Sequence, residues 1–566
     1  MRIVLCAINS KFIHSNLAVH LLKAYALRFD AEKEKNIEIA EYTINNYAED
    51  VLADLYLKKP DVIMFSCYIW NWEFTRSLFC DIHKVLPEAQ IWVGGPEVSF
   101  DAEMTLKKYP DIKGVMIGEG EQTFKELALD HYFAQTAELK NIAGLCYRDE
   151  NTIIRTKERA LLSMDDVPFV YNDSNIAEFE HKIIYYESSR GCPFSCSYCL
   201  SSIDKSVRFR SLKKVYQELQ FFLDHKVPQV KFIDRTFNVD HEHSIGILSY
   251  ILEHDNGITN FHFEIAGDIL TEEELNLMQQ MRPGLIQLEI GVQSVNPDTI
   301  HAIHRVMNLP KLKKIVKNVN QMENIHQHLD LIAGLPYENY ESFANSFNDV
   351  YAMEPEQLQL GFLKVLKGSP MEKAAGQYGI VYKKQAPYEV LFTNWISYDE
   401  ILKLKKIEEM VELYYNSHQF SKTIKVLETN FSSPFEMYEQ LSDFYEQNGF
   451  FLNSPSRIYR YQVLLEFALK TAPDQKELYQ DLLTYDLYLR ENCKSRPSFA
   501  ADLQPYRETI RELKLDKQLH IDVFRHNIFS DDPEIIKKKN NGILMVSFDY
   551  QKRNPLDHNA YAVRIQ

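Results

Sequence analysis

The chain has 566 residues, too many for a single hydrophobic core, so about three domains are expected. Its composition, 45% hydrophobic and 25% charged, is typical of a soluble globular protein, and no run of eighteen apolar residues predicts a membrane span. A net charge of −17 argues against broad electrostatic capture of DNA or RNA, which depends on Lys and Arg. We therefore expect neither a nucleic-acid partner nor a membrane.

The number and spacing of the cysteines indicate in which redox environment the protein works. The eight of them are mostly unpaired in spacing, which suits a reducing cytoplasm better than a disulfide scaffold. Residues 1–5 pass directly into a strand-like pattern without the architecture of a signal peptide. We expect a cytoplasmic protein.

The first third of the chain alternates β-branched runs with helical stretches. Strands are expected at residues 3–8, 37–44, 62–66, 91–95 and 114–118, with helices at 16–27, 49–57 and 73–85. This alternation predicts an α/β fold with a doubly wound parallel sheet, Rossmann-like in class. Ligands of such sheets bind at the carboxyl ends of the strands.

Three loops at those strand ends are candidate ligand contacts. The third strand is followed by an aromatic loop with Tyr68 and Trp70, the fourth by Gly94-Gly95-Pro96-Glu97, and the fifth by Gly118-Glu119-Gly120-Glu121. Glycine permits close backbone approach to a bulky ligand, although each loop alone is also ordinary turn chemistry. His14, after the first strand, is either a polar contact to a cofactor or a solvated loop residue.

Residues 136–182 look like a connector. The runs 144–148 and 153–156 flank Asp149-Glu150-Asn151, which predicts a β-hairpin. Cys146 would then be a packed strand residue.

One cysteine-rich stretch carries the chemistry. Cys192, Cys196 and Cys199 fall within eight residues in a C-x3-C-x2-C spacing. Thiolates select iron–sulfur clusters, zinc or copper(I), and a closed zinc site needs four protein ligands, which this run does not supply. Three thiolates on a four-iron cluster leave one iron open. Structural zinc and three unrelated core cysteines remain the alternatives.

From residue 183 a second strand–helix alternation begins. Strands are expected at 183–187, 229–233, 261–266, 285–290, 329–333 and 357–363, with helices such as 212–223 and 272–281. Active sites of parallel barrels lie at the carboxyl ends of the strands. Polar residues gather there; they are Asp234, Glu264, Asp268, Glu289, Gln293, Ser294 and Asp330. Each could also be a satisfied hydrogen bond of the barrel rim.

The cysteine spacing, with Tyr198 before the last cysteine, resembles the signature of the radical S-adenosylmethionine (radical SAM) superfamily. The resemblance implies a partial (β/α)6 barrel and a 4Fe–4S cluster on Cys192, Cys196 and Cys199. The open iron would chelate SAM, and one electron would cleave it to a 5′-deoxyadenosyl radical. By position, Asp234, Gln293 and Ser294 would contact SAM, and the segment 331–338, with Gly334, would pack the adenine. Arg305 would meet the SAM carboxylate or be solvated.

The Gly-Gly-Pro-Glu and Gly-Glu-Gly-Glu loops, in this order, resemble the cobalamin-binding domain fused in front of many radical SAM enzymes. The resemblance implies that Tyr68 and Trp70 face the corrin ring, while Gly94, Gly95, Pro96, Glu97, Gly118, Glu119 and Gly120 hold the nucleotide tail. The Asp-x-His-x-x-Gly motif of mutase-type domains is absent from the sequence, which weakens a mutase interpretation. A flavodoxin-like or nucleotide-binding use of the sheet remains an alternative.

Beyond residue 370 the pattern becomes mainly helical. Helical spacing covers 398–415, 458–469 and 473–492, and residues 542–548 close the region as a strand. It resembles an uncharacterised carboxy-terminal module of such enzymes. The expected organisation is a cobalamin-binding domain (1–135), a connector (136–182), a radical SAM barrel (183–370) and a helical domain (371–566), the last acting as a lid or substrate-recruiting cap.

The combined pattern predicts a cobalamin-dependent radical SAM enzyme that methylates an unactivated carbon. The runner-up is a cobalamin-assisted oxidation, cyclisation or rearrangement without methyl transfer. From another class, the chain could be a cobalamin- or metal-sensing module, although a carrier needs no cluster with an open iron. Methylthiolation of RNA would need a further cluster. Expected partners are a small-molecule or peptide substrate and an external one-electron reductant such as flavodoxin or ferredoxin.

Overall fold

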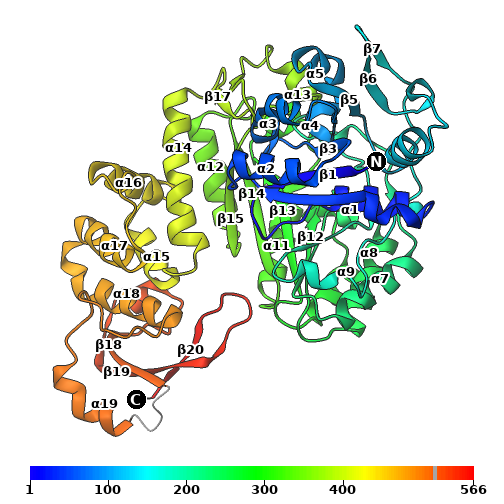
Figure 1. Cartoon of the computed structure of the whole chain (residues 1–566). Helices are drawn as coiled ribbons and strands as arrows, with labels where there is room; N and C mark the ends of the chain where they lie inside the picture. The colour runs from blue at the N-terminus through cyan, green and yellow to red at the C-terminus, as the bar shows by residue number, and fades with distance from the viewer. Residues whose placement is uncertain (514–518, 566) are drawn as a thin grey trace. The chain divides into compact units, whose positions relative to one another are not determined.

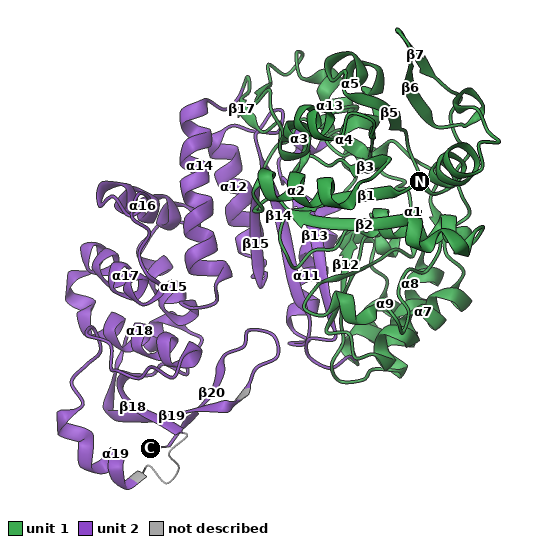
Figure 2. Cartoon of the chain, viewed as in Figure 1, with its two compact units in different colours: residues 1–280, 301–307, 362–394 green, residues 281–300, 308–361, 395–566 purple. Residues whose placement is uncertain are grey.

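The computed structural model describes residues 1–513 and 519–565, so residues 514–518 and 566 of the expected helical domain lie outside the described residues. The chain forms two compact units (Figure 2). Unit 1 comprises residues 1–280, 301–307 and 362–394, and unit 2 comprises residues 281–300, 308–361 and 395–566. The four-part domain division expected from the sequence stays a prediction.

The first sheet lies in unit 1 and has the strand order β2-β1-β3-β4-β5-β6-β7 (Figure 1). Strands β1 to β5 are mutually parallel, as expected for a doubly wound sheet. Their bounds are Ile3–Asn9, Ile37–Thr43, Val62–Ser66, Gln90–Gly94 and Ile112–Met116. The connecting helices are α1 (Leu17–Leu27), α2 (Ala48–Lys58), α3 (Trp72–Val85), α4 (Pro96–Ser99) and α5 (Ala102–Lys108).

The predicted hairpin is formed by β6 (Leu145–Asp149) and β7 (Thr152–Arg155), and it extends this sheet. Strand β6 pairs antiparallel with β5, with Cys146 opposite Val115. Cys146 is fully buried in the core of the sheet. It is therefore a packed strand residue, as the sequence indicated.

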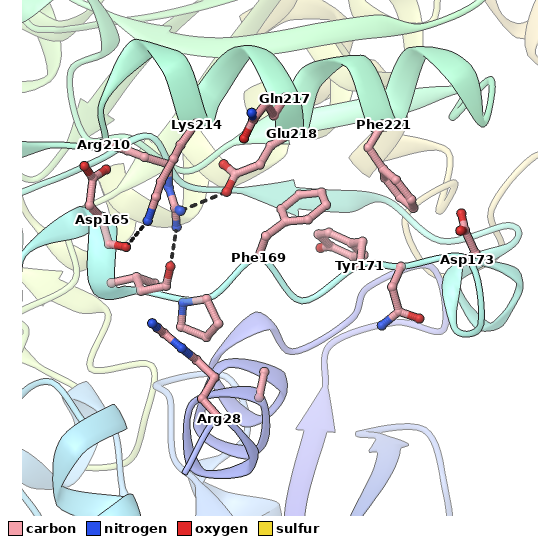
Figure 3. Close-up of a pocket in the computed structure, with 14 residues that line it drawn as sticks. Arg28, Asp165, Phe169, Tyr171, Asp173, Arg210, Lys214, Gln217, Glu218 and Phe221 are labelled. Atoms are coloured by element: carbon pink, nitrogen blue, oxygen red, sulfur yellow. Dashed lines mark hydrogen bonds and ion pairs between the residues drawn. The ribbon is translucent and has the colours of Figure 1, made fainter. Parts of the chain in front are cut away.

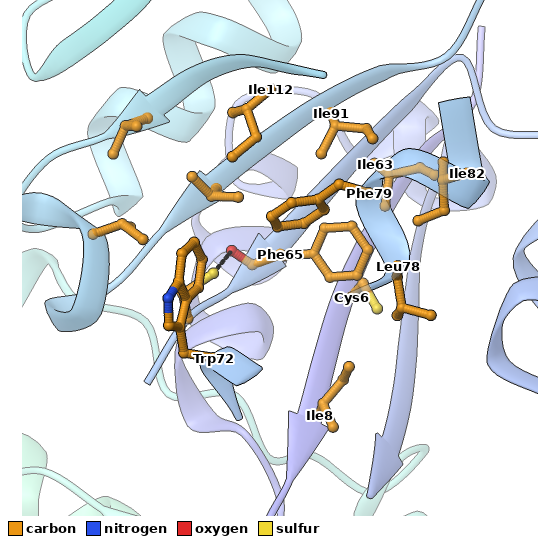
Figure 4. Packing of buried hydrophobic residues seen from close by; sticks show 14 of the residues in the cluster. Cys6, Ile8, Ile63, Phe65, Trp72, Leu78, Phe79, Ile82, Ile91 and Ile112 are labelled. Carbon is orange, nitrogen blue, oxygen red and sulfur yellow. Dashed lines mark hydrogen bonds between the residues drawn. The ribbon is translucent and has the colours of Figure 1, made fainter. Parts of the chain in front are cut away.

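Alternate residues of β1 face two separate cores, which is why the sheet is covered on both faces. Val4, Cys6 and Ile8 pack with side chains of α2 and α3, whereas the residues between them pack with α1 and with α6 (Glu121–Lys125). Figure 4 shows the first of these cores, in which Phe65 and Phe79 meet edge to face with ring centroids 5.6 Å apart. Each buried phenylalanine contributes roughly 2–3 kcal/mol of hydrophobic stabilisation.

The second alternation provides six further strands, all within two residues of their expected starts except β14. In unit 1, β8 (Ile184–Tyr186), β11 (Gln229–Phe232) and β12 (Asn260–Ile265) are parallel neighbours in the order β12-β11-β8. Their helices are α7 (Leu212–Asp224), α8 (His241–Glu253) and α9 (Glu272–Gln279). Thr271 and Glu274 form a capping box that begins α9.

Unit 2 contributes β13 (Ile286–Gln293), β14 (His326–Ala333) and β15 (Gln357–Phe362), with α11 (Leu309–Asn320) and α12 (Tyr340–Tyr351). Strands β13 and β14 pair in parallel. Strand β14 begins earlier than expected because polar residues at its start, including His326, hide its apolar pattern.

The carboxy-terminal part of unit 2 is mainly helical, as expected. It contains α14 (Tyr398–Val411), α15 (Ser421–Leu427), α16 (Pro434–Gln447), α17 (Arg457–Thr471) and α18 (Lys476–Arg490). The predicted final strand is β19 (Lys539–Arg553), which lies between β18 (Leu519–His526) and β20 (Ala560–Arg564) in an antiparallel sheet. Among the described residues, helices with the length and apolarity needed to cross a bilayer do not occur.

Candidate active site

The three-cysteine loop follows β8 in unit 1. Cys192 and Cys196 are buried, Cys199 is half-buried, and all three are free thiols. Gly191 begins the loop with φ of +97°, and a Cβ there would lie 2.5 Å from the carbonyl oxygen of Ser206. Only glycine fits this close approach of two backbone segments.

Hydrogen bonds hold the loop without using the thiols. The amide of Cys192 donates to the carbonyl of Asp204 at 3.1 Å, and the hydroxyl of Ser202 donates to the carbonyls of Cys196 and Cys199 at 2.9 and 2.7 Å. The loop is therefore ordered mainly by its backbone. Two of its sulfur atoms make only long contacts, 3.7 Å between Cys192 Sγ and Thr236 Oγ1 and 3.8 Å between Cys196 Sγ and Arg305 Nη1, and thiolates are ligands that suit a soft metal centre. This donor set fits a three-thiolate cluster.

Arg305 brings a positive charge to the same loop. Its Nη1 lies 3.8 Å from Sγ of Cys196 and 3.4 Å from the hydroxyl of Tyr198, so the expectation of a solvated Arg305 was wrong. Burial raises the pKa of Tyr198, so this phenol stays protonated. The Arg305 guanidinium therefore lies beside one of the three candidate ligand sulfurs.

Asp234, predicted to contact SAM, lies at the end of β11 and is almost fully buried. Its carboxylate accepts hydrogen bonds from the amide and hydroxyl of Ser188, at 3.0 and 2.7 Å, and from the hydroxyl of Ser189 at 2.5 Å. Burial raises its pKa, and the serine hydrogen bonds oppose that shift. Asp234 thus fixes the position of Ser188 and Ser189, which lead into the cysteine loop. Its contact with SAM stays a prediction.

In unit 2, Ser294, another predicted SAM contact, is hydrogen-bonded to a buried carboxyl group. Glu338 accepts hydrogen bonds from the hydroxyls of Ser294 at 2.7 Å and Ser346 at 2.8 Å. Burial raises the pKa of Glu338 to about 7. Glu338 lies in the predicted segment 331–338, but the sequence gave no sign of its raised pKa, since that shift depends on burial and on a hydrogen bond from Ser294, 44 positions away.

Gln293 ends β13 at a register shift and adopts φ of +73°. It is buried, and its Oε1 is without a hydrogen-bond partner among the described residues. A buried acceptor with unused capacity is suited to a ligand donor. Gly334, with φ of +86°, follows β14. Their roles toward SAM remain predictions.

Three further ligand-type side chains lie close together in unit 2. Glu289 and His328 are register partners on β13 and β14, and with Asp330 they place one ligand atom each within 4.8 Å of the others. His328 Nε2 lies 3.0 Å from a carboxylate oxygen of Asp330. Sequence reasoning noted both acids but missed His328, which becomes their neighbour only through strand pairing.

At the carboxyl end of β3, Tyr68 and Trp70 stack with ring centroids 4.3 Å apart and an angle of 13°. Trp70 is 47% exposed, so a flat apolar face is presented to solvent beside the strand ends. His14 lies in the loop after β1. It is not simply solvated, because its Nδ1 lies 2.6 Å from the hydroxyl of Tyr185. Burial lowers the pKa of His14, and Lys11 and Lys231 lower it further.

The two glycine-rich loops follow β4 and β5 as expected, and their acidic residues are paired with basic ones. Glu97 lies 2.9 Å from Nζ of Lys367, and Glu119 is hydrogen-bonded to Arg208. Gly94, Gly95 and Pro96 lead directly into α4, and Gly118 and Gly120 flank Glu119. The glycine contacts with a nucleotide tail remain predictions.

A pocket of about 680 Å³ lies elsewhere in unit 1, between α1 and α7 (Figure 3). Residues predicted from the sequence as site residues do not line it. Its buried Arg210 is paired with Glu218 at 2.9 Å and with the carbonyl of Val167 at 3.0 Å. The pocket therefore does not belong to the strand-end site.

Comparisons with known proteins agree with this organisation. A family described as "B12 binding domain" matches residues 3–128, one described as "Radical SAM superfamily" matches residues 186–350, and one described as "Protein of unknown function (DUF4080)" matches residues 376–560. The chain thus contains, in this order along the sequence, a region that matches a B12-binding domain, a region that matches the radical SAM superfamily and a region that matches DUF4080.

Among curated relatives, an uncharacterised methyltransferase, PH0819, of Pyrococcus horikoshii is 25% identical over 73% of this chain and 88% of its own length. The cobalamin-dependent radical SAM methyltransferase TokK of Streptomyces tokunonensis is 25% identical over 57% of this chain, which spans half of TokK. Among solved structures, the cobalamin-dependent SAM radical enzyme OxsB superposes with a TM-score of 0.58 at 16% identity, covering 83% of this chain and 80% of OxsB. This last likeness shows the fold.

Proposed function

We propose that this protein is a cobalamin-dependent radical SAM methyltransferase. The observation that carries the proposal is one loop with three free thiols, Cys192, Cys196 and Cys199, at the end of a barrel strand. The same chain carries a region that matches a B12-binding domain, in which Tyr68 stacks on the exposed Trp70 after β3. The methyltransferase relatives support the reaction class.

The bound groups would be a 4Fe–4S cluster, SAM and cobalamin. Together they supply a carbon-centred radical that can take hydrogen from an unactivated C–H bond, and a methyl group, chemistry that acid–base side chains cannot provide. The three cysteines would hold the cluster, and Arg305 would stabilise the thiolate of Cys196. Gln293 and Ser294 would orient SAM, and Tyr68 and Trp70 would pack against the corrin.

The substrate would be a small molecule or a peptide, and an external one-electron reductant such as flavodoxin or ferredoxin would supply the electron. A cytoplasmic location follows from the need to keep the thiols reduced.

Anaerobic reconstitution with iron, sulfide and SAM tests the catalytic part of the proposal. We expect the native chain to develop the broad absorption of a 4Fe–4S cluster and to release 5′-deoxyadenosine when reduced. Cys196→Ala should lose both, whereas Cys493→Ala, which alters a half-buried cysteine far from the motif in the chain, should keep both. Undiminished 5′-deoxyadenosine from Cys196→Ala would refute catalysis by this cluster.

A further inference from the structure

The two glycine-rich loops of the B12-binding domain are each tied to the cysteine loop, one at its start and the other at its middle. All residues involved belong to unit 1. The ties use the acidic side chains that the sequence assigned to the cofactor, Glu97 and Glu119.

The first tie joins the loop after β5 to the residue preceding the cysteine loop. Arg190 directly precedes Gly191 and Cys192, and its guanidinium lies 2.6 Å from Glu121 and 3.5 Å from Glu119. Arg208, the register partner of Arg190 in a short antiparallel pair, also binds Glu119. Glu119 therefore lies between two arginines from the two strands that frame the loop.

These charges are shielded from water. The side chain of Glu121 is 5% exposed, that of Arg190 13%, and that of Glu119 20%. Ion pairs at such burial keep a defined geometry, because neither partner can turn into solvent without losing its counter-charge. These ion pairs therefore fix the orientation of the two segments relative to each other as well as holding them together.

The second tie runs from the loop after β4 to the middle of the cysteine loop. Lys367 lies 2.9 Å from Glu97 and 3.2 Å from Asp101, and the hydroxyl of Tyr388 also binds Glu97. Four residues further on, the amide of Met371 donates to the carbonyl of Ser197 at 2.8 Å. Ser197 stands between Cys196 and Tyr198.

The short segment between these two contacts has little freedom. Gly368 adopts φ of +80°, and a Cβ there would lie 2.3 Å from the ring of Phe100, which follows α4. The hydroxyl of Ser369 accepts from the amide of Glu372 at 3.2 Å and so begins α13 (Pro370–Ala374). A displacement of Glu97 would therefore be passed along residues 367–371 to Ser197.

We infer that Glu97 and Glu119 are positioning residues that hold the cysteine loop in register with the corrin-binding loops, and that they do not contact the cofactor. The inference rests on the proposed function for the identity of the two groups being aligned. Both loops thus have two parts: glycines that can approach a ligand, and an acidic residue that fixes the loop to the cluster-bearing segment.

Hydrogen exchange of the full-length protein without cofactors tests the ties directly. Glu119→Gln and Lys367→Met should each raise amide exchange at residues 191–199 by about tenfold, which corresponds to about 1.4 kcal/mol. Glu126→Gln is the matched control, since Glu126 pairs with Arg159 in the same part of the chain but outside the cysteine loop. Exchange confined to residues 94–101 or 118–121 would overturn the inference.

A distance measurement in the loaded protein distinguishes positioning from local stability. Pulsed electron paramagnetic resonance between Co(II) cobalamin and the reduced cluster should give one narrow distance for the native chain and for Glu126→Gln, and a broader one for Lys367→Met. An unchanged distance width in Lys367→Met, or weakened corrin binding with unchanged amide exchange at residues 191–199 in either tie variant, would overturn the inference. Failure of the native chain to bind corrin or cluster would instead refute the proposed function, and the exchange experiment would still stand.

Discussion

Glu338 illustrates how burial sets the behaviour of a single residue. Its side chain is 1% exposed, and its hydrogen-bond donors are neutral serine hydroxyls rather than a cation. Water would solvate the ionised carboxylate better than two hydroxyls do, so the protonated form is favoured in the folded state. The pKa of Glu338 is accordingly raised from 4.5 to about 7.

The raised pKa predicts how Glu338→Gln changes stability with pH. Between about pH 4.5 and 7 the folded state retains a proton that the unfolded chain releases, so this group lowers the free energy of unfolding as pH rises. Glutamine does not titrate, so the Glu338→Gln variant does not lose stability at this position as pH rises. Relative to the native chain, Glu338→Gln should gain roughly 3 kcal/mol of stability from pH 4.5 to pH 8. Calorimetric unfolding of both chains across this range measures the gain, and a pH-independent difference would contradict the assignment.

Trp70 provides a second residue-scale prediction. Truncating a stacking indole should cost roughly 2 kcal/mol, so Trp70→Ala should weaken corrin binding about 30-fold. Tyr56→Ala is the control, because Tyr56 is similarly exposed (48% against 47%). It lies near the end of α2, which leads into the amino end of β3, whereas Trp70 follows the carboxyl end of that strand. Absorbance titration with cobalamin gives both affinities. Equal affinities for the two variants would remove Trp70 from the corrin site.

Residues in local motifs could be predicted from the sequence, whereas residues acting through distant contacts could not. The cysteine loop is a motif of eight positions, so its spacing carries the chemistry. Arg305 reaches Cys196 across 109 positions, and Lys367 reaches the carbonyl of Glu97 across 270. No local pattern marks either one, because a surface Lys or Arg has the same sequence surroundings.

At the scale of elements, the start of the cysteine loop depends on a backbone conformation. Gly191→Ala adds a Cβ 2.5 Å from a carbonyl oxygen at φ of +97°, so the loop must move. Gly257→Ala is the control, since Gly257 has φ of +74° but nothing within 4 Å of its added Cβ. Both variants carry the left-handed strain of about 1–3 kcal/mol, and only Gly191→Ala carries the clash.

Iron bound per chain after reconstitution should therefore fall in Gly191→Ala and stay at the native level in Gly257→Ala. Equal iron content in the two variants would show that the loop tolerates displacement. It would also weaken the claim that backbone contacts preorganise the cluster site.

The positions of elements with a strong apolar pattern could be predicted closely from the sequence, whereas the strands with which they pair could not. The strands β1 and β3 begin where their apolar runs begin, because buried parallel strands need continuous hydrophobic residues. The hairpin β6–β7 was predicted as a hairpin, but its pairing with β5 depends on which sheet edge is open. That choice is tertiary and leaves no periodic signal.

At the scale of the whole molecule, the three matched regions suggest different roles in the proposed reaction. The B12-binding and radical SAM matches cover residues 3–128 and 186–350, and the DUF4080 match covers residues 376–560. The first two account for the cofactors of the proposed reaction. The third adds α14 to α18 and a three-stranded sheet, and we propose that it recruits or covers the substrate.

The pairing of a cluster site and a corrin site on one chain is tested most directly with SAM labelled in its methyl group. The protein, reconstituted with cluster and cobalamin and reduced without oxygen, should transfer the label to the bound corrin and release 5′-deoxyadenosine. Corrin that stays unlabelled, with no 5′-deoxyadenosine formed by a protein that demonstrably holds both cofactors, would contradict the account.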